Sequence, residues 1–288
     1  MNDQTLMAIY SLVAIGALAS IILFISSKKF FIFEDPDIDI IEEILPAANC
    51  GGCGYPGCRP FAQEVVKEKN LDVLYCPVGG SEVMGKIADY LNIESVQRGT
   101  TVAVLKCNGT NKFHQSILKY EGASSCALAH SLYGGEGACT YGCLKLADCC
   151  NVCDFDALHI SESTGLPVVD ELKCTSCGAC VKACPRGLFE IREKTDDLAD
   201  VYVACSNYDR GNIAKKNCLV ACTGCMKCVK VYDNKEMVNV ENFLCYIQAK
   251  TDLALAQQMA DVCPTNAILA KNVDRYTPVK VKGENDEA

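Results

Sequence analysis

The sequence has no tryptophan, few aromatic residues of any kind, and three histidines among its 288 residues. A chain of this length predicts two or three small domains, and few aromatic side chains are available to build their cores. Metal ligation would then supply part of the stability that larger cores give. His114, His130 and His159 are scattered along the chain, which is typical of structural histidines rather than of metal ligands.

Several motifs of catalysis and nucleotide binding are missing. No G-x-G-x-x-G follows a strand-like run, and there is no G-x-x-x-x-G-K-[ST], so no nucleotide site is predicted. No pairing of a nucleophile with a base is visible, and no catalytic residue is expected. The net charge of −9 argues against nucleic acid as the main partner, because binding phosphates needs a basic face.

The apolar run TLMAIYSLVAIGALASIILFIS, residues 5–26, carries no charge. At about 1.5 Å of helical rise per residue it is long enough to cross the hydrocarbon core of a membrane. A signal peptide or a buried helix are the alternatives. A signal peptide would have a basic segment before the apolar run, whereas here Asp3 precedes it and Lys28 and Lys29 follow. The sequence therefore predicts a transmembrane anchor over residues 1–29, with the rest of the chain on the cytoplasmic side.

What the sequence has in excess is cysteine, with 22 residues in tight local groups. The groups are too compact to be the cross-links of a secreted disulfide scaffold, and they favour metal binding in a reducing compartment. Zinc and iron–sulfur clusters are the two candidates, and the spacing favours iron–sulfur.

The first group lies in CGGCGYPGC and the later CPVGG, and it consists of Cys50, Cys53, Cys58 and Cys76. Glycine lets the backbone turn tightly and point its amides at an inorganic core. This group predicts a [4Fe-4S] cluster, with zinc as the alternative because C-x2-C is also half of a zinc site.

A second signal is the C-x2-C-x2-C-x3-C-P run of a bacterial two-cluster ferredoxin, whose fourth cysteine binds the neighbouring cluster. The run consists of Cys174, Cys177, Cys180 and Cys184. Its expected partner run is stretched, and consists of Cys139, Cys143, Cys149 and Cys153, with Asp154 in place of the usual proline. The ferredoxin cross-over predicts two clusters. One would be bound by Cys139, Cys143, Cys149 and Cys184, and the other by Cys153, Cys174, Cys177 and Cys180.

A third run, CTGCMKC, contains Cys222, Cys225 and Cys228, and Tyr232 stands where the fourth cysteine would be. Downstream, CPTNAI supplies Cys263, and the stretch that would carry three more ligands keeps only Cys245. The sequence predicts a degenerate ferredoxin unit with one cluster, bound by Cys222, Cys225, Cys228 and Cys263.

Six cysteines remain outside these four sets: Cys107, Cys126, Cys150, Cys205, Cys218 and Cys245. Cys107 and Cys205 end two similar strand-like runs, VAVLKC and VYVAC, which suggests that two strands deliver thiols to one place. Cys126 and Cys218 would complete a further four-cysteine site. The alternative is that these are ordinary buried cysteines. The sequence therefore predicts four [4Fe-4S] clusters, or five with this further site.

Basic residues are concentrated between Arg210 and Lys235, close to the third cysteine run. A solvated face is one interpretation, and a docking patch for an acidic partner is the other. The residues expected to dock such a partner are Lys215, Lys216, Lys227 and Lys230.

The overall prediction is an α+β chain in which a transmembrane helix is followed by a small four-cysteine domain and then by ferredoxin-like units. The expected divisions are an anchor (1–29), a four-cysteine domain (34–93), an α/β connecting segment (100–136), a two-cluster ferredoxin domain (137–195), a connector (196–216), a degenerate ferredoxin-like domain (217–273) and an acidic tail (274–288).

The order of these parts resembles the B subunit of the Rnf electron-transport complex. The resemblance rests on the anchor, on DPDIDIIEEILPAANCGGCGYPGC with CPVGG, and on CTYGCLKLADC with KCTSCGACVKACPRGL. It covers nearly the whole chain. It implies a membrane complex that moves electrons between ferredoxin and NAD, coupled to Na⁺ or H⁺ transport, with the flavin and NAD sites on other subunits.

In that family this subunit resembles an arm that accepts electrons from soluble ferredoxin and passes them to membrane subunits. The expected location is the cytoplasmic membrane, with one transmembrane segment. The cluster of Cys50, Cys53, Cys58 and Cys76, which follows the anchor, is expected to be the exit. A zinc-bound adaptor, or the same subunit serving a complex that reduces a redox regulator, are the alternatives.

Overall fold

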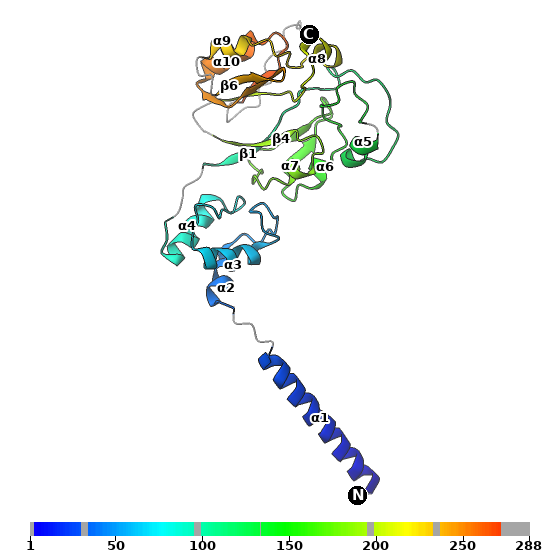
Figure 1. The fold of residues 1–288 in the computed structure, drawn as a ribbon, viewed down its shortest axis with the longest axis vertical. Helices are drawn as coiled ribbons and strands as arrows, with labels where there is room; N and C mark the ends of the chain where they lie inside the picture. The colour runs from blue at the N-terminus through cyan, green and yellow to red at the C-terminus, as the bar shows by residue number, and fades with distance from the viewer. Residues whose placement is uncertain are drawn as a thin grey trace.

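The computed structural model describes residues 3–29, 34–94, 99–132, 134–194, 199–232 and 237–271, and it arranges them as a projecting helix and two lobes (Figure 1). The predicted acidic tail lies outside the described residues. The smaller lobe contains the four-cysteine domain, and the larger one contains both ferredoxin-like units. The α+β prediction is confirmed.

Helix α1 (Asp3–Lys29) extends away from the lobes, at the N-terminal end of the molecule (Figure 1). Its described apolar side chains face outward all round, with Leu12 and Leu23 about 70% exposed (70% and 69%). Among the described helices it is the one that is long and apolar enough to cross a membrane, with a mean hydropathy of 1.7 over Leu12–Lys29. A helix that is apolar on every side fits a lipid surrounding, because no face is reserved for water.

The four-cysteine domain is built from α2 (Pro36–Ile44), α3 (Cys58–Glu68) and α4 (Gly80–Leu91). Asp35 caps α2 by accepting a hydrogen bond from the Asp37 amide, and Pro36 occupies the first helical position, where its missing N–H costs nothing. The buried faces of the three helices form one core with Ile41, Phe61 and Ile87 at its centre.

In the first ferredoxin-like unit, β1 (Thr101–Leu105) pairs antiparallel with β4 (Phe189–Glu193), and β2 (Leu158–Ile160) pairs with β3 (Pro167–Val169). The helices are α5 (Cys126–Leu132), α6 (Asp148–Asn151) and α7 (Ala179–Ala183). Strand β1 comes from the predicted connecting segment, so this segment contributes a strand to the unit that follows it.

The second unit has a three-stranded antiparallel sheet with β5 (Ala199–Val203) between β8 (Ala249–Thr251) and β9 (Ile268–Lys271), and a hairpin of β6 (Val238–Glu241) and β7 (Leu244–Ile247). Its helices are α8 (Gly211–Asn217), α9 (Lys227–Val231) and α10 (Leu253–Val262). Strand β5 comes from the predicted connector, as β1 does in the first unit.

A buried arginine joins the two units. Arg192 on β4 donates hydrogen bonds to the Asp200 carboxylate (2.8 Å) and to the Val201 carbonyl on β5 (3.2 Å), and a further one to the Ile247 carbonyl on β7. Since a buried charge is tolerated only when it is paired, this network holds the strands of both units in one arrangement.

Candidate iron–sulfur sites

Apart from Cys150 and Cys245, the cysteines gather in five groups of four. We number them in the order in which they contact one another, starting from the end of the molecule farthest from α1. Site 1 is Cys222, Cys225, Cys228 and Cys263; site 2 is Cys107, Cys139, Cys205 and Cys218; site 3 is Cys126, Cys143, Cys149 and Cys184; site 4 is Cys153, Cys174, Cys177 and Cys180; site 5 is Cys50, Cys53, Cys58 and Cys76.

Sites 1 and 4 have the groupings that the spacing predicts. In each, the four sulfurs lie around one cavity of about 20 Å³. A fifth thiol, Cys245, also lines the cavity of site 1. Its sulfur lies 3.2 Å from that of Cys228, and its amide donates to the Cys222 sulfur at 3.4 Å. The hydrogen bond between the two thiols lowers the pKa of Cys228.

The loops of these two sites share a backbone geometry. In each, the residues two and four positions after the first cysteine have positive φ: Ser176 and Gly178 after Cys174, and Gly224 and Met226 after Cys222. A short helix then begins, and it brings in the third cysteine six positions after the first. Left-handed residues at these positions turn successive amides toward the enclosed space.

A third loop has the same geometry, and it belongs to site 3. Lys145 and Ala147 have positive φ, two and four positions after Cys143, and α6 then carries Cys149. Cys143, rather than Cys139, is therefore the first cysteine of this run. The position of the second cysteine is taken by Leu146.

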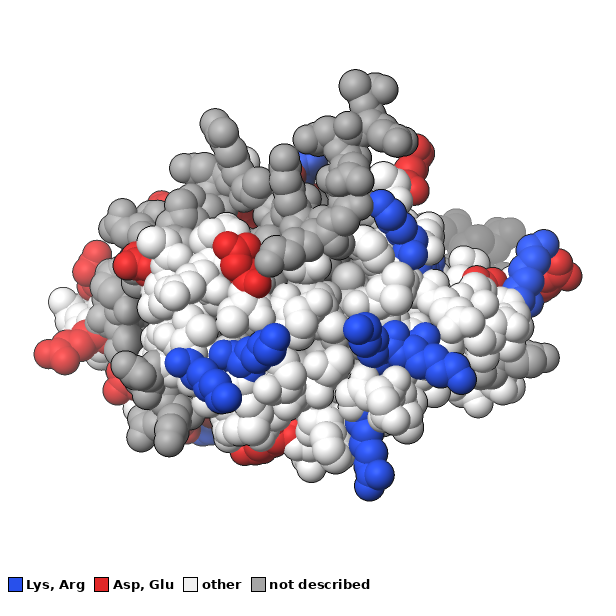
Figure 2. Space-filling model, turned by 90° about the horizontal axis from the view of Figure 1, so that it is seen from above, with Lys and Arg blue, Asp and Glu red and all other residues white. Residues whose placement is uncertain are grey.

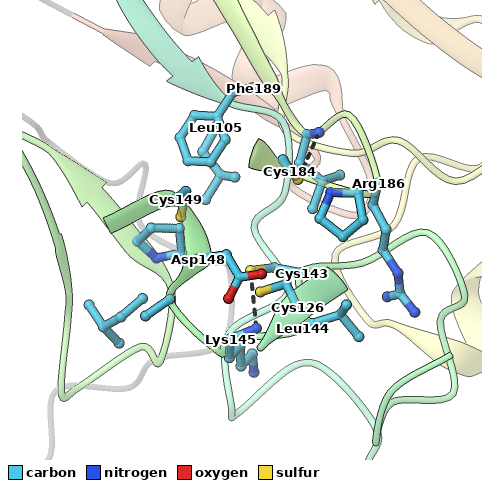
Figure 3. A pocket seen from close by; sticks show the side chains of 15 residues that line it. Leu105, Cys126, Cys143, Leu144, Lys145, Asp148, Cys149, Cys184, Arg186 and Phe189 are labelled. Atoms are coloured by element: carbon cyan, nitrogen blue, oxygen red, sulfur yellow. Dashed lines mark hydrogen bonds between the residues drawn. The ribbon is translucent and has the colours of Figure 1, made fainter. Parts of the chain in front are cut away.

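Cys126 supplies the thiol that Leu146 lacks. It is the first residue of α5, and backbone groups of Leu146 and Asp148 hydrogen-bond to its sulfur. The Asp148 carboxylate fixes the start of α5, since it accepts hydrogen bonds from the Ser125 hydroxyl (3.1 Å) and the Ala127 amide (3.0 Å). Figure 3 shows the Cys126 and Cys143 sulfurs side by side, with Cys149 and Cys184 on other sides of the same cavity.

The structure thus exchanges two cysteines relative to the sequence prediction. Cys139 was expected with Cys143, Cys149 and Cys184, but it lies at site 2, where the Asn207 side chain donates to its sulfur at 3.4 Å. Cys126 was expected at the further site, but it lies at site 3. The reason is the missing second cysteine of the Cys143 run, which leaves a position that only a thiol from another segment can fill.

Site 5 lies in the smaller lobe. Cys53, Cys58 and Cys76 pack against its hydrophobic core. Burial raises the pKa of the Cys76 thiol, and the nearby Cys53 and Cys50 raise it further. Backbone amides point at the sulfurs: Gly79 donates to Cys76 at 3.4 Å, and Gly52 donates to Cys50 at 3.5 Å.

Sites 4 and 5 meet where the two lobes touch. A Cβ atom on Gly52 would lie 2.8 Å from the carbonyl oxygen of Cys177 and 3.0 Å from its Cα, so only glycine permits this approach. The Lys182 ammonium on α7 donates to the Gly51 carbonyl at 3.4 Å. The loops of the two sites are therefore in direct contact.

Sequence reasoning gave no signal for Arg186, which lines site 3. Its guanidinium donates to the carbonyl of Cys139 (3.4 Å) and to those of Gly142 and Gly134, while its Nε atom is buried and finds no hydrogen-bond partner among the described residues. Burial lowers the pKa of this side chain, and the cysteines around it raise it. A buried cation with an unused donor suits a cavity that receives a group with negative charge and acceptor atoms.

Burial also raises the pKa of several thiols that line the cavities. For Cys143, Cys180 and Cys205 the pKa rises to about 12, and for Cys218 to about 11. Such thiols keep their protons until a metal replaces them. Within the described residues, no group of three or more His, Cys, Asp or Glu side chains converges closely enough for a single ion. The thiols, amides and buried cation fit a larger inorganic group with its own acceptor atoms.

The comparisons with known proteins agree with this chemistry. A family model described as a putative Fe-S cluster matches residues 45–78, around site 5, and a 4Fe-4S binding domain matches residues 167–190, across sites 3 and 4. The second match favours iron–sulfur over zinc, the alternative that the spacing left open.

Relatives match over nearly the whole chain. The B subunit of the ion-translocating oxidoreductase complex of Methanosarcina acetivorans is 37% identical over 93% of this chain and 99% of its own length. This chain belongs to the family of Rnf B subunits. The B subunit of the Na⁺-translocating ferredoxin:NAD⁺ oxidoreductase complex of Acetobacterium woodii is 37% identical over 88% of this chain and 74% of its own. That of the proton-translocating complex of Clostridium ljungdahlii is 31% identical over 99% of both.

Membership of the Rnf family makes the chain an iron–sulfur component of a multi-subunit membrane complex. The apolar α1 fits that membership. The resemblance seen in the sequence is confirmed.

Proposed function

We propose that this subunit accepts electrons from reduced ferredoxin at site 1 and relays them to the membrane subunits at site 5, within a complex that delivers them to NAD and transports Na⁺ or H⁺. Sites 1, 3, 4 and 5 would each hold one [4Fe-4S] cluster. A bound cluster takes up and releases single electrons with little rearrangement. The observation that carries the proposal is the row of four-cysteine sites that runs from an exposed thiol in one lobe to the lobe joined to α1.

Site 1 is suited to accept electrons from a soluble partner because its loop reaches the surface. Cys225 is exposed, while Cys222 and Cys228 are buried. Next to Cys225 the apolar Met226 side chain is 51% exposed. An exposed apolar surface at a cluster loop lets a partner approach closely without desolvating charges.

Exposed lysines lie on two helices at this end of the molecule. The predicted docking residues lie on α8 and α9, the elements at the end of the molecule opposite α1, and all four are exposed: Lys215, Lys216, Lys227 and Lys230. Figure 2 views the molecule from that end and shows Lys and Arg side chains across the middle and lower part of the surface, with Asp and Glu mainly toward the left edge and the rim. Such a surface attracts an acidic partner and orients it before contact.

Site 5 is suited to deliver electrons to membrane subunits because its lobe follows α1 in the chain. Lys28 and Lys29 end α1 and would place both lobes on the cytoplasmic side by the positive-inside rule. The lobe is thereby kept close to the membrane surface, within reach of partners embedded there.

The docking proposal predicts a salt-dependent reaction with ferredoxin. Reversing the charge of Lys227 and Lys230 together (to Glu) is expected to slow reduction by a reduced two-cluster ferredoxin roughly 10- to 100-fold at low salt, because steering is lost. The rate is measured by stopped-flow bleaching of cluster absorbance across a salt series, and the difference should shrink as salt screens the charges.

The matched control reverses two exposed lysines of the smaller lobe, Lys67 and Lys86, and should leave the rate unchanged. A rate that is the same at every salt concentration, or equally slow in the control, would show that the α8 and α9 lysines do not guide ferredoxin.

A further inference from the structure

Site 2 lies between the two ferredoxin-like units, outside any ferredoxin cysteine run. Cys107 follows β1 of the first unit, Cys205 follows β5 of the second, and Cys218 follows α8. Cys139 comes from the loop before the Cys143 run. The two strand ends are held side by side, since the Asn108 amide donates to the Ala204 carbonyl at 3.0 Å. All four sulfurs line one cavity of about 20 Å³, the size found at sites 3 and 4.

The two units contribute to site 2 in the same way. The amide of Cys143, the first cysteine of the site 3 run, donates to the Cys107 sulfur at 3.4 Å. Cys222, the first cysteine of the site 1 run, hydrogen-bonds through its backbone to the Cys205 sulfur. Equivalent residues of the two units therefore hold equivalent strand-end thiols, which chance burial of unrelated cysteines does not explain.

Other polar groups around site 2 are arranged for an acceptor inside the cavity. His114 lines it, and its Nε2 atom is buried without a hydrogen-bond partner in the part of the chain that the structure describes. Burial and the nearby Lys145 and Arg186 lower the pKa of this imidazole. Gly109 leaves room beside the thiols: a Cβ atom there would lie 3.6 Å from the Cys107 sulfur and 3.7 Å from that of Cys218.

We propose that site 2 binds a fifth [4Fe-4S] cluster, held by Cys107, Cys139, Cys205 and Cys218, and that this cluster is the link between site 1 and site 3. The buried thiolates supply four negative charges, and the His114 Nε2 and the backbone amides supply donors to the sulfur atoms of such a cluster.

The linking role rests on the proposed function and follows from the contacts. Site 2 touches site 1 through Cys205 and Cys222, and site 3 through Cys107 and Cys143. Sites 3 and 4 are joined by two short helices: α6 carries Cys149 just before Cys153, and α7 carries Cys180 just before Cys184. These contacts place site 2 between site 1 and site 3. Each step moves one electron, oxidising the site that gives it and reducing the next, with reduced ferredoxin as the donor.

The test replaces Cys107 with Ser and Cys218 with Ser, one at a time, in the full chain purified without oxygen. Iron and acid-labile sulfide should each fall by about four per chain, and one set of cluster signals should disappear from the low-temperature EPR spectrum. Reduced ferredoxin should still reduce site 1, while reduction of sites 3, 4 and 5 should become at least tenfold slower. Cys150→Ser, which changes a thiol outside the five sites, is the matched control and should keep full iron content.

Losing a cluster between two units can also unfold them, so a second variant leaves every thiol in place. Gly109→Leu puts a side chain against two of the sulfurs and should lower iron by about four while circular dichroism stays native. Full iron content in all three variants would overturn the fifth cluster. Iron loss with undiminished reduction of sites 3 to 5 would overturn the linking role.

If ferredoxin does not reduce the unmodified chain at all, the proposed function fails. The iron count of the variants would still show whether site 2 binds a cluster.

Discussion

Replacing Cys126 with Ala is expected to remove the cluster of site 3 and to interrupt the proposed electron flow from site 2 to site 4. The thiol takes the place that Leu146 leaves without a ligand, and alanine offers no atom that could replace it. Iron should fall by about four atoms per chain. Magnetic coupling between sites 3 and 4 should vanish from the EPR spectrum of the reduced protein, and site 5 should no longer be reduced by ferredoxin.

Two further variants separate this grouping from the one that the spacing predicts. Cys139→Ala should remove a different cluster, that of site 2, and should leave the coupling between sites 3 and 4 in place. Cys150→Ala changes the neighbour of Cys149 without removing a thiol from any site, and should leave all clusters loaded. If Cys139→Ala abolished the coupling and Cys126→Ala did not, the grouping that the spacing predicts, with Cys139 at site 3, would be right.

Replacing Gly52 with Val is expected to separate sites 4 and 5 without emptying either. The added Cβ would lie 2.8 Å from the Cys177 carbonyl oxygen and 3.0 Å from the Cys177 Cα, both in the larger lobe, so the lobes must move apart. Overpacking of this kind costs about 1–3 kcal/mol. That cost weakens the contact between the lobes by about 5- to 150-fold. Iron content should stay full and ferredoxin should still reduce sites 1 to 4, while reduction of site 5 slows by a corresponding factor.

The control for this experiment is Gly85→Ala. Gly85 lies in α4 of the same lobe, and a Cβ there meets no atom within 4 Å. It should keep the wild-type rate and stabilise the lobe slightly, by about 0.5–1 kcal/mol, because alanine favours helix. Rapid reduction of site 5 in Gly52→Val would mean that electrons leave the larger lobe by another route.

Cysteine spacing predicts correctly those ligands that lie together in one run of the sequence, because the spacing determines which thiols a single loop can bring to one cluster. Site 4 follows this rule, apart from Cys153, which the ferredoxin cross-over supplies. Site 3 breaks it at Leu146, and the replacement thiol arrives by a tertiary contact between α5 and Asp148 that no spacing encodes. One signal was nevertheless available. Cys143, Cys174 and Cys222 are each followed six positions later by another cysteine, and this interval marks Cys143 as the start of its run.

Site 2 shows the same limit in another form. The likeness of the two strand-like runs placed Cys107 and Cys205 together, because similar strands in similar units end in similar places. The fourth thiol of site 2 is that of Cys139, because Cys126 lies at site 3 instead. This exchange follows only from the position of α5, which the sequence does not show. The roles of Arg186 and Gly52 depend on backbone carbonyls that approach from distant segments, and residue type alone gives no indication of them.

The order of the five sites along the chain bears on how the protein is made. The last cysteine to leave the ribosome is Cys76 for site 5, Cys180 for site 4, Cys184 for site 3, Cys218 for site 2 and Cys263 for site 1. Because domains fold from the N-terminus as synthesis proceeds, the five sets of cysteines become complete one after another, from site 5 to site 1. Nascent chains stalled between Cys184 and Cys218 should hold the iron of sites 3 to 5 only. Under the proposed relay, an unfinished chain would lack site 1, where ferredoxin is proposed to dock, and it could not receive electrons from ferredoxin before site 5, the proposed outlet, is in place.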